Sequence, residues 1–125
     1  MISLKEVLQI HNLLIDKYGG SKGVRDINAL EAALQRPHAT FDNKELYPSA
    51  VLKASAIFES IISNHPFIDG NKRTGWVMMR LILLENNMDI VASQKEKYNF
   101  VISAASGKLS FDEISEWIDR NKIIK

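Results

Sequence analysis

The sequence of 125 residues predicts an all-α domain of about six helices around one central helix, at about residues 71–85. Apolar residues recur every three or four positions in several segments, which is typical of helices with one buried face. The stretch 75–84 is apolar nearly all round, which indicates a buried helix. At two predicted helix starts a Ser precedes a Glu by three residues, the pattern of a capping box.

The predicted helices cover residues 3–17, about 26–36, 49–63, 71–85 and 94–105, and a last one starts after Ser110. Ser3 and Ser110 begin capping boxes with Glu6 and Glu113, and Asp26 or Asn28 can cap the second helix. Pro37 ends that helix, because the residue before a proline avoids the helical region. Pro48 fits the first turn of the third helix. In the fifth helix we expect one inward face, made of Tyr98, Val101, Ile102 and Ala105.

Residues 37–48 form the longest stretch without helical periodicity. The pairs Thr40–Phe41 and Leu46–Tyr47 have adequate strand propensity for a short β-hairpin. Residues 88–93 are predicted to be a plain connection. The chain contains no internal repeat, low-complexity tract or linker, so residues 1–125 are expected to form a single domain.

The composition excludes several classes of protein. The apolar fraction of 46% is ordinary for a globular domain, and sixteen basic and fifteen acidic residues leave a net charge of +1. That balance gives no support to direct nucleic-acid binding. The absence of cysteine excludes disulfides and thiolate metal sites, and no apolar run is long enough to span a membrane. With no signal-peptide pattern at the N-terminus, we expect a cytoplasmic protein without membrane contact.

The most informative stretch is residues 64–74, at the start of the central helix. The first turn of a helix has free N–H groups and a partial positive charge, so it can hold a phosphate. Gly70 lets the backbone approach an anion, and Asn71 can cap the helix while offering an amide donor. Lys72 and Arg73 oppose the helix dipole at this end, which suggests that an anion binds them.

Two other residues of this stretch can do chemistry. Asp69 can hold Mg²⁺, which proteins bind through one or two carboxylates together with phosphate oxygens. His65 can act as a general base, since histidine is the side chain best suited to exchange a proton near neutral pH. Phe67 is expected to anchor the loop to the core. Each of these residues, taken alone, is as well explained by the needs of a turn between two helices. His11 on the first helix is expected to be a hydrogen-bonded histidine at the core edge.

The combined spacing is more specific than any single residue. Residues 65–73 read HPFIDGNKR, which resembles the Fic/Doc (Fido) signature HPFx[D/E]GN[G/K]R in its lysine-containing version. Residues 23–26, 30–37 and 47–48 resemble the upstream segment of that family, and residues 104–110 resemble the end of the short Doc toxins. The resemblance covers nearly the whole chain and implies a Fido-type helical bundle, with the short hairpin as a flap that aligns a segment of the target protein.

The resemblance also implies an ATP-dependent transferase with Mg²⁺. In that family pattern His65 takes the proton from a hydroxyl of a target protein. The implied roles of the other positions are Mg²⁺ binding by Asp69, phosphate binding by the Gly70 N–H and by Asn71, and charge stabilisation by Lys72 and Arg73. Two alternatives stay open, a non-catalytic helical binding module and a nucleic-acid binder, and the net charge disfavours the second.

The transferred group is the least determined property. AMP-transferring Fic enzymes typically read HPFx[D/E]GNGRxxR, whereas this chain has Lys72 at the glycine and Trp76 at the second arginine. Both changes resemble the Doc pattern, in which the γ-phosphate faces the target. Pro66 and Gly70 are the Fic-type residues. We weigh the two positions near phosphate more heavily and predict phosphoryl transfer to a Ser or Thr hydroxyl, with AMP transfer as the alternative.

The resemblance implies two protein partners. The target would be a translation elongation factor of the GTPase class. The inhibitory pattern [S/T]xxxE[G/N] of many Fido proteins has no match, because Ser60 follows Glu59 in the nearest candidate and Leu81 lies four positions before Glu85 in the other. We therefore expect inhibition in trans by an antitoxin, as in Doc-type toxin–antitoxin pairs.

Overall fold

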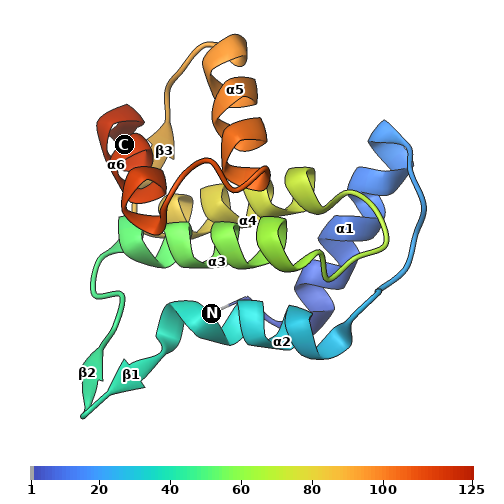
Figure 1. Cartoon of the computed structure of the whole chain (residues 1–125), viewed down its shortest axis with the longest axis horizontal. Coiled ribbons are helices and arrows are strands. Elements are labelled where there is room, and N and C mark those ends of the chain that lie inside the picture. The colour runs from blue at the N-terminus through green and yellow to red at the C-terminus, as the bar shows by residue number, and fades with distance from the viewer. Residues whose placement is uncertain (1) are drawn as a thin grey trace.

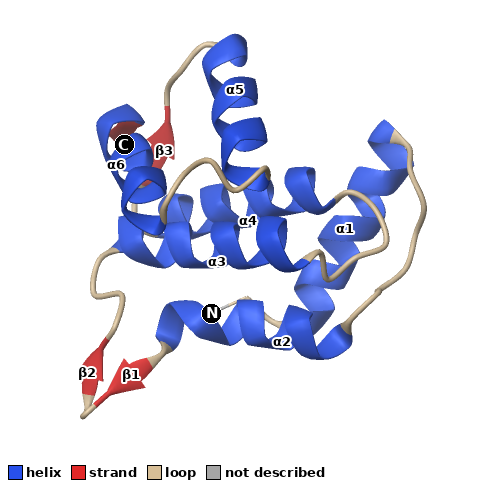
Figure 2. Ribbon diagram, viewed as in Figure 1, coloured by secondary structure: helices blue, strands red, loops and turns tan. Residues whose placement is uncertain are grey.

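The computed structural model describes residues 2–125, and in this range the chain forms six α-helices and two small two-stranded sheets (Figures 1 and 2). The elements are α1 (Leu4–Tyr18), α2 (Ile27–Gln35), the 3₁₀ turn η1 (Arg36–His38), β1 (Thr40–Phe41), β2 (Lys44–Glu45), α3 (Ala50–Asn64), α4 (Asn71–Glu85), β3 (Met88–Ile90), α5 (Gln94–Ala105), α6 (Phe111–Asn121) and β4 (Lys122–Ile124). The predicted all-α class is confirmed. None of these helices is long and apolar enough to cross a membrane.

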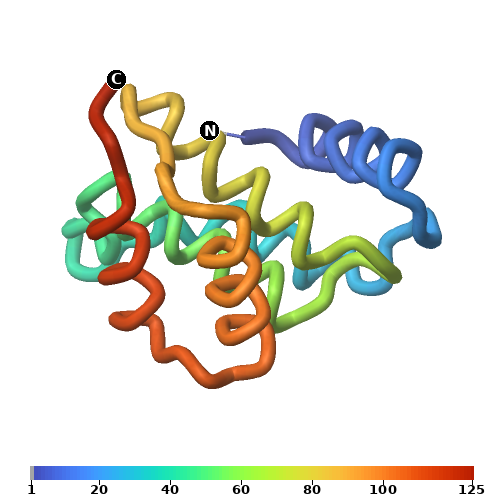
Figure 3. The backbone as a smooth tube through the Cα atoms, turned by 90° about the horizontal axis from the view of Figure 1, so that it is seen from above, coloured from blue at the N-terminus to red at the C-terminus, as the bar shows by residue number. Residues whose placement is uncertain are grey.

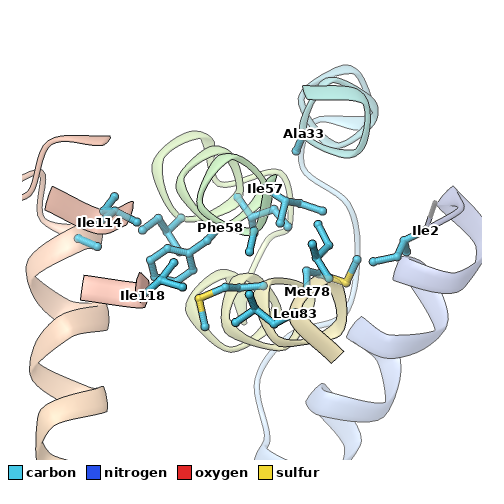
Figure 4. Close-up of a cluster of buried hydrophobic side chains, with 14 of the residues drawn as sticks. Ile2, Ala33, Ile57, Phe58, Met78, Leu83, Ile114 and Ile118 are labelled. Atoms are coloured by element: carbon cyan, nitrogen blue, oxygen red, sulfur yellow. The ribbon is translucent and has the colours of Figure 1, made fainter. Parts of the chain in front are cut away.

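Helices α3 and α4 form an antiparallel pair at the centre of the fold (Figures 1 and 3). Gly75 lets them approach closely, because a Cβ at this position would lie 3.0 Å from Cγ2 of Ile62. The core sits along this pair: Phe58 on α3 and Met78, Met79 and Leu83 on α4 are fully buried (Figure 4). The prediction that the central helix is buried all round is too strong, since Leu84 is 39% exposed.

The other helices cover the two sides of the central pair. Helix α1 packs against α4 and α2 packs against α3, whereas α5 and α6 lie on the opposite side (Figures 3 and 4). Residues 65–70, which join α3 to α4, therefore lie at the end of the pair that is close to α1 (Figure 1).

Most of the observed helix starts agree with the starts predicted from the sequence. Side chains cap α1, α2, α3, α5 and α6, with capping boxes at α1, α5 and α6; the caps are Ser3, Asp26, Ser49, Ser93 and Ser110. Because Ser49 is the cap of α3, Pro48 precedes the helix, and its predicted place in the first turn is wrong. Asn71 is the first residue of α4 and Gly70 is its cap, so the prediction of an Asn71 cap is also wrong.

The predicted hairpin exists with a different second strand. Thr40 pairs with Glu45 and Phe41 with Lys44. Asp42 and Asn43 form the turn with φ of 53° and 62°, a two-residue loop in the left-handed conformation that hairpins favour. This tight turn brings the second strand forward from the predicted Leu46–Tyr47.

The hairpin lies beside the start of α3, at the far end of that helix from His65 (Figures 1 and 3). A helix of 15 residues is about 22 Å long, so the two features are well separated along the fold. Lys53 holds the hairpin there, since its Nζ donates to the carbonyls of Pro37 and Tyr47 and to Glu45. This position does not support the expected role of the hairpin in aligning a target at His65.

Two features near the C-terminus differ from prediction. Met88–Ile90 is strand β3, not a plain connection, and it pairs with β4 at the C-terminal end. Helix α5 buries Phe100 and Ala104, and Val101 and Ala105 are partly buried against the core. Tyr98 is 67% and Ile102 38% exposed, so the predicted face is wrong for these two residues. The reason is aromatic packing, because the Phe100 ring stacks on Trp117 at 3.9 Å and on Phe58 at 5.3 Å.

Candidate active site

The loop of residues 65–70 is anchored by one buried aromatic ring. Phe67 is fully buried and stacks on the imidazole of His11 with ring centroids 3.8 Å apart. His11 is itself 2% exposed, and its Nε2 lies 2.8 Å from the carbonyl oxygen of Asp69. Both predictions are confirmed: Phe67 anchors the loop, and His11 is a hydrogen-bonded histidine at the core edge.

Asn71 closes the loop from the helix side. Its Oδ1 accepts from the N–H of Phe67 at 3.0 Å, and its Nδ2 donates to the Phe67 carbonyl at 2.9 Å. The side chain thus uses its oxygen and one N–H inside the loop, and Asn71 is only 8% exposed. A phosphate contact through its remaining amide hydrogen stays a prediction.

A second segment, residues 20–26, runs along the loop and fixes its backbone. Val24 and Phe67 form an antiparallel bridge, and the N–H of Ile68 donates to the Gly23 carbonyl at 3.0 Å. The N–H groups of Arg25 and Asp26 both donate to the Pro66 carbonyl, at 2.8 and 3.0 Å. The site is therefore built by two pieces of chain, of which the sequence motif contains one.

His65 lies where α3 ends. It is the C-terminal cap of the helix in the left-handed conformation, with φ of 48° and ψ of 60°, and its N–H donates to the Ile61 carbonyl at 3.2 Å. Its side chain is exposed, and among the described residues the imidazole has no hydrogen-bond partner. Both ring nitrogens are thus open to an incoming group.

The carboxylate of Asp69 is oriented by the backbone. Oδ2 accepts from the N–H of Ser21 at 3.1 Å and Oδ1 from that of Gly70 at 2.9 Å. These two hydrogen bonds, Ser21 first, lower the pKa of Asp69 below its usual value and favour the charged form. Gly20 is required beside it, because a Cβ there would lie 2.7 Å from Oδ2.

The Gly70 N–H is therefore already engaged by Asp69, and its predicted role as a phosphate donor is not supported. Gly70 instead shapes the chain: its φ is 75°, and a Cβ would lie 3.0 Å from Cδ1 of Ile15. Because Gly70 has no side chain, α4 begins without a side-chain cap, unlike the five other helices in residues 2–125. The free N–H groups of the first turn are those of residues 71–73.

The two cations of the motif are both exposed at this helix start. The guanidinium of Arg73 lies 4.5 Å from the ring centroid of Tyr18 at the end of α1, a cation–π contact. Arg80, two turns further on, forms a two-point ion pair with Asp89 at 2.7 and 2.9 Å, away from this site. Trp76 packs edge-on against Phe100 and Trp117, at 6.4 and 6.3 Å between ring centroids.

The structure thus brings the predicted residues together at the junction of α3 and α4: His65, Asp69, Gly70, Asn71, Lys72 and Arg73. Sequence reasoning missed the residues that hold them, which are Tyr18, Gly20, Ser21 and Arg25. Two signals could have pointed to this segment. They are the adjacent glycines at 19 and 20, and the segment's own resemblance to the upstream part of the Fic/Doc pattern.

Comparison with known proteins shows the family of this chain. The model of the Fic/DOC family matches residues 1–83, which include α1, the 20–26 segment, the loop and most of α4. The chain belongs to the Fic/Doc family. Over 75 residues it is 40% identical to Toxin Doc of Mycolicibacterium smegmatis, a match that covers 60% of this chain and 58% of that protein. Over 119 residues it is 28% identical to Protein kinase doc of Escherichia phage P1, covering 95% of this chain and 93% of that protein.

Proposed function

We propose that this chain is a Doc-type toxin that transfers the γ-phosphate of ATP to a Ser or Thr hydroxyl of a target protein. Its family membership and the names of its two relatives, Toxin Doc and Protein kinase doc, support the proposal. One observation carries it: helix α4 starts without a side-chain cap, two residues after Asp69 and six residues after an exposed His65.

The start of α4 is suited to the phosphates of ATP. The uncapped N–H groups of the first turn and the helix dipole both favour an anion. Lys72 and Arg73 add two cations at the same point, where neither has an acidic partner among the described residues. In phosphoryl transfer such groups stabilise charge on the transferred phosphate and on the leaving group.

Asp69 fits Mg²⁺ as a single carboxylate ligand. Its pKa is low, and each of its oxygens accepts only one hydrogen bond, which leaves lone pairs free. Residues 2–125 contain no cluster of three or more acidic, His or Cys side chains, so phosphate oxygens and water would complete the coordination, as is usual for Mg²⁺. When bound, Mg²⁺ would neutralise charge on the β- and γ-phosphates.

His65 is proposed as the general base. Its neutral imidazole takes the proton from the Ser or Thr hydroxyl while that oxygen bonds to the γ-phosphorus. The bond from the γ-phosphorus to the β–γ bridging oxygen breaks, and ADP leaves with the electron pair. Arg73 and the first turn of α4 stabilise the negative charge that develops on ADP.

The choice of γ-phosphate over AMP rests on two residues near the phosphates. Lys72 occupies the position that is glycine in AMP-transferring Fic enzymes, and it adds volume and charge there. Trp76 occupies the position of their second arginine, and its ring is packed among Phe100 and Trp117. This chain therefore lacks the outer phosphate clamp, which favours the Doc-type orientation of the nucleotide.

The biological setting is part of the same proposal. The target is proposed to be a translation elongation factor of the GTPase class, whose modification would arrest growth. A separate antitoxin is proposed to inhibit the toxin in trans. In α3, the candidate internal inhibitor Ser55–Glu59 is not available for that role, because Glu59 pairs with Arg36 at 2.9 Å and Ser55 donates to the Val51 carbonyl.

The test uses ATP labelled at either the α- or the γ-phosphate, with the full chain and a candidate elongation factor. We expect label on the factor from γ-labelled ATP alone, and its loss in His65→Ala. Label from α-labelled ATP would show AMP transfer instead. Transfer at full rate in His65→Ala would refute the catalytic assignment, and no transfer from either label, with toxicity in cells unaffected by His65→Ala, would favour a non-catalytic binding module.

A further inference from the structure

Arg25 makes an unusual set of contacts with the chain around His65. Its Nε donates to the carbonyl of His65 at 2.7 Å, and its Nη2 donates to the carbonyl of Asn64. Its backbone N–H donates to the next carbonyl, that of Pro66, at 2.8 Å. One residue therefore binds three consecutive carbonyl groups, those just before, at and just after the proposed base.

These carbonyls need partners. The last carbonyl groups of a helix receive no hydrogen bond from within the helix. A cation near them stabilises this end of the helix. His65 also adopts a left-handed conformation that a residue with a Cβ seldom takes without support. Because its imidazole has no hydrogen bond within the described residues, the direction in which it projects depends on the backbone conformation of His65.

We propose that Arg25 is a positioning residue for His65, which holds the end of α3 in the conformation that presents the imidazole to substrate. This inference rests on the proposed function. Arg25 acts on carbonyls of the loop and not on the first turn of α4, so it should affect the transfer step and leave ATP binding unchanged. Its planar guanidinium reaches two carbonyls at once, which a lysine ammonium cannot do in the same geometry.

The experiment compares the full chain with Arg25→Ala, Arg25→Lys and the control Lys22→Ala. Lys22 is a good control because it lies in the same segment and carries the same charge, and its ion pair, with Asp16, is exposed. Circular dichroism checks that each variant is folded. Arg25→Lys keeps the charge, so it remains informative if Arg25→Ala fails to fold.

The first readout does not depend on activity. The chain has three histidines, so NMR can resolve the imidazole of His65 from those of His11 and His38, with assignment by single substitutions. In Arg25→Ala we expect the His65 ring signals to shift and its amide to exchange at least about 10-fold faster. His11 and His38 should be unchanged, and Lys22→Ala should resemble wild type.

The second readout is transfer from γ-labelled ATP to the elongation factor. We expect the turnover rate to fall by about 10- to 100-fold in Arg25→Ala, and less in Arg25→Lys, with KM for ATP within about two-fold of wild type. Wild-type His65 signals in Arg25→Ala overturn the inference, and so does undiminished turnover. If wild type transfers nothing, the proposed function fails, while the His65 signals still decide whether Arg25 positions the ring.

Discussion

Asp89 forms a two-point ion pair with Arg80, and Asp89→Asn should weaken the fold in a pH-dependent way. Asp89 is 7% exposed in strand β3. It accepts from Nε and Nη2 of Arg80 on α4 at 2.9 and 2.7 Å and from the N–H of Ile90 at 2.8 Å. Lys125, after β4, adds a second cation at 3.6 Å. The residue therefore joins the central helix to the β3–β4 sheet.

These contacts, the Arg80 hydrogen bonds first, lower the pKa of Asp89 from 3.8 to about 2. A shift of roughly two units corresponds to about 2.5 kcal/mol of stabilisation of the charged form. Because the Arg80 side chain is 43% exposed, solvent screening reduces this to about 1–2 kcal/mol. The folded pKa lies below the unfolded one, so the stabilisation is complete above about pH 4 and is lost as the pH falls through about 2.

The assay is urea unfolding at about pH 7 and about pH 2.5, followed by the fluorescence of Trp76 and Trp117. We expect Asp89→Asn to lower the free energy of unfolding by about 1–2 kcal/mol at the higher pH and by much less at the lower. Asp119→Asn is the control, because Asp119 pairs with Lys122 while 61% exposed, and it should cost less than about 0.5 kcal/mol. Equal losses in the two variants, or a loss for Asp89→Asn that is the same at both pH values, would refute this reasoning.

Two further predictions concern the site, and a third concerns the stability contributed by Thr74. Gly20→Ala should displace the Asp69 carboxylate and weaken Mg²⁺-dependent ATP binding in calorimetry, whereas Gly19→Ala, with a similar positive φ of 88° but open space around a Cβ, should not; equal effects would contradict the contact. Tyr18→Leu should weaken ATP binding about two- to five-fold by removing the cation–π contact with Arg73, and Tyr18→Phe should retain it, so equal losses would exclude that role. Thr74→Val should leave the free energy of unfolding in urea unchanged or raise it by up to about 1 kcal/mol, because the buried Thr74 hydroxyl has no partner in the described structure; a clear loss would mean that it has one.

The features that depend on residues close together in the sequence were predicted correctly from it. The caps at Ser3, Asp26 and Ser110 bond to residues within one turn, so these helix starts can be predicted from neighbouring residues. The central helix at 71–85 was predicted at its observed bounds. The HPFIDGNKR motif placed a possible base, a carboxylate and two cations at one helix start, because all of them lie within nine residues.

Contacts between distant segments had to come from the tertiary structure. The sequence does not specify which groups of residues 20–26 bond to residues 64–69, since several of those hydrogen bonds run between backbone groups that nearly every residue carries. For the same reason β3 and its pairing with β4 were missed, and the face that α5 buries was decided by the rings of Phe58 and Trp117.

The site shows the same division. The sequence by itself identified the residues that can act in catalysis, because a base, a carboxylate or a cation is a group carried by a single side chain. Only the tertiary structure showed how they are held. The Gly70 N–H donates to Asp69, Asn71 hydrogen-bonds to the loop backbone, and Arg25 donates to the carbonyl of His65. The chemical type of a side chain is a property of that residue, but its orientation depends on neighbours that can be distant in the sequence, as Ser21 is 48 residues from Asp69.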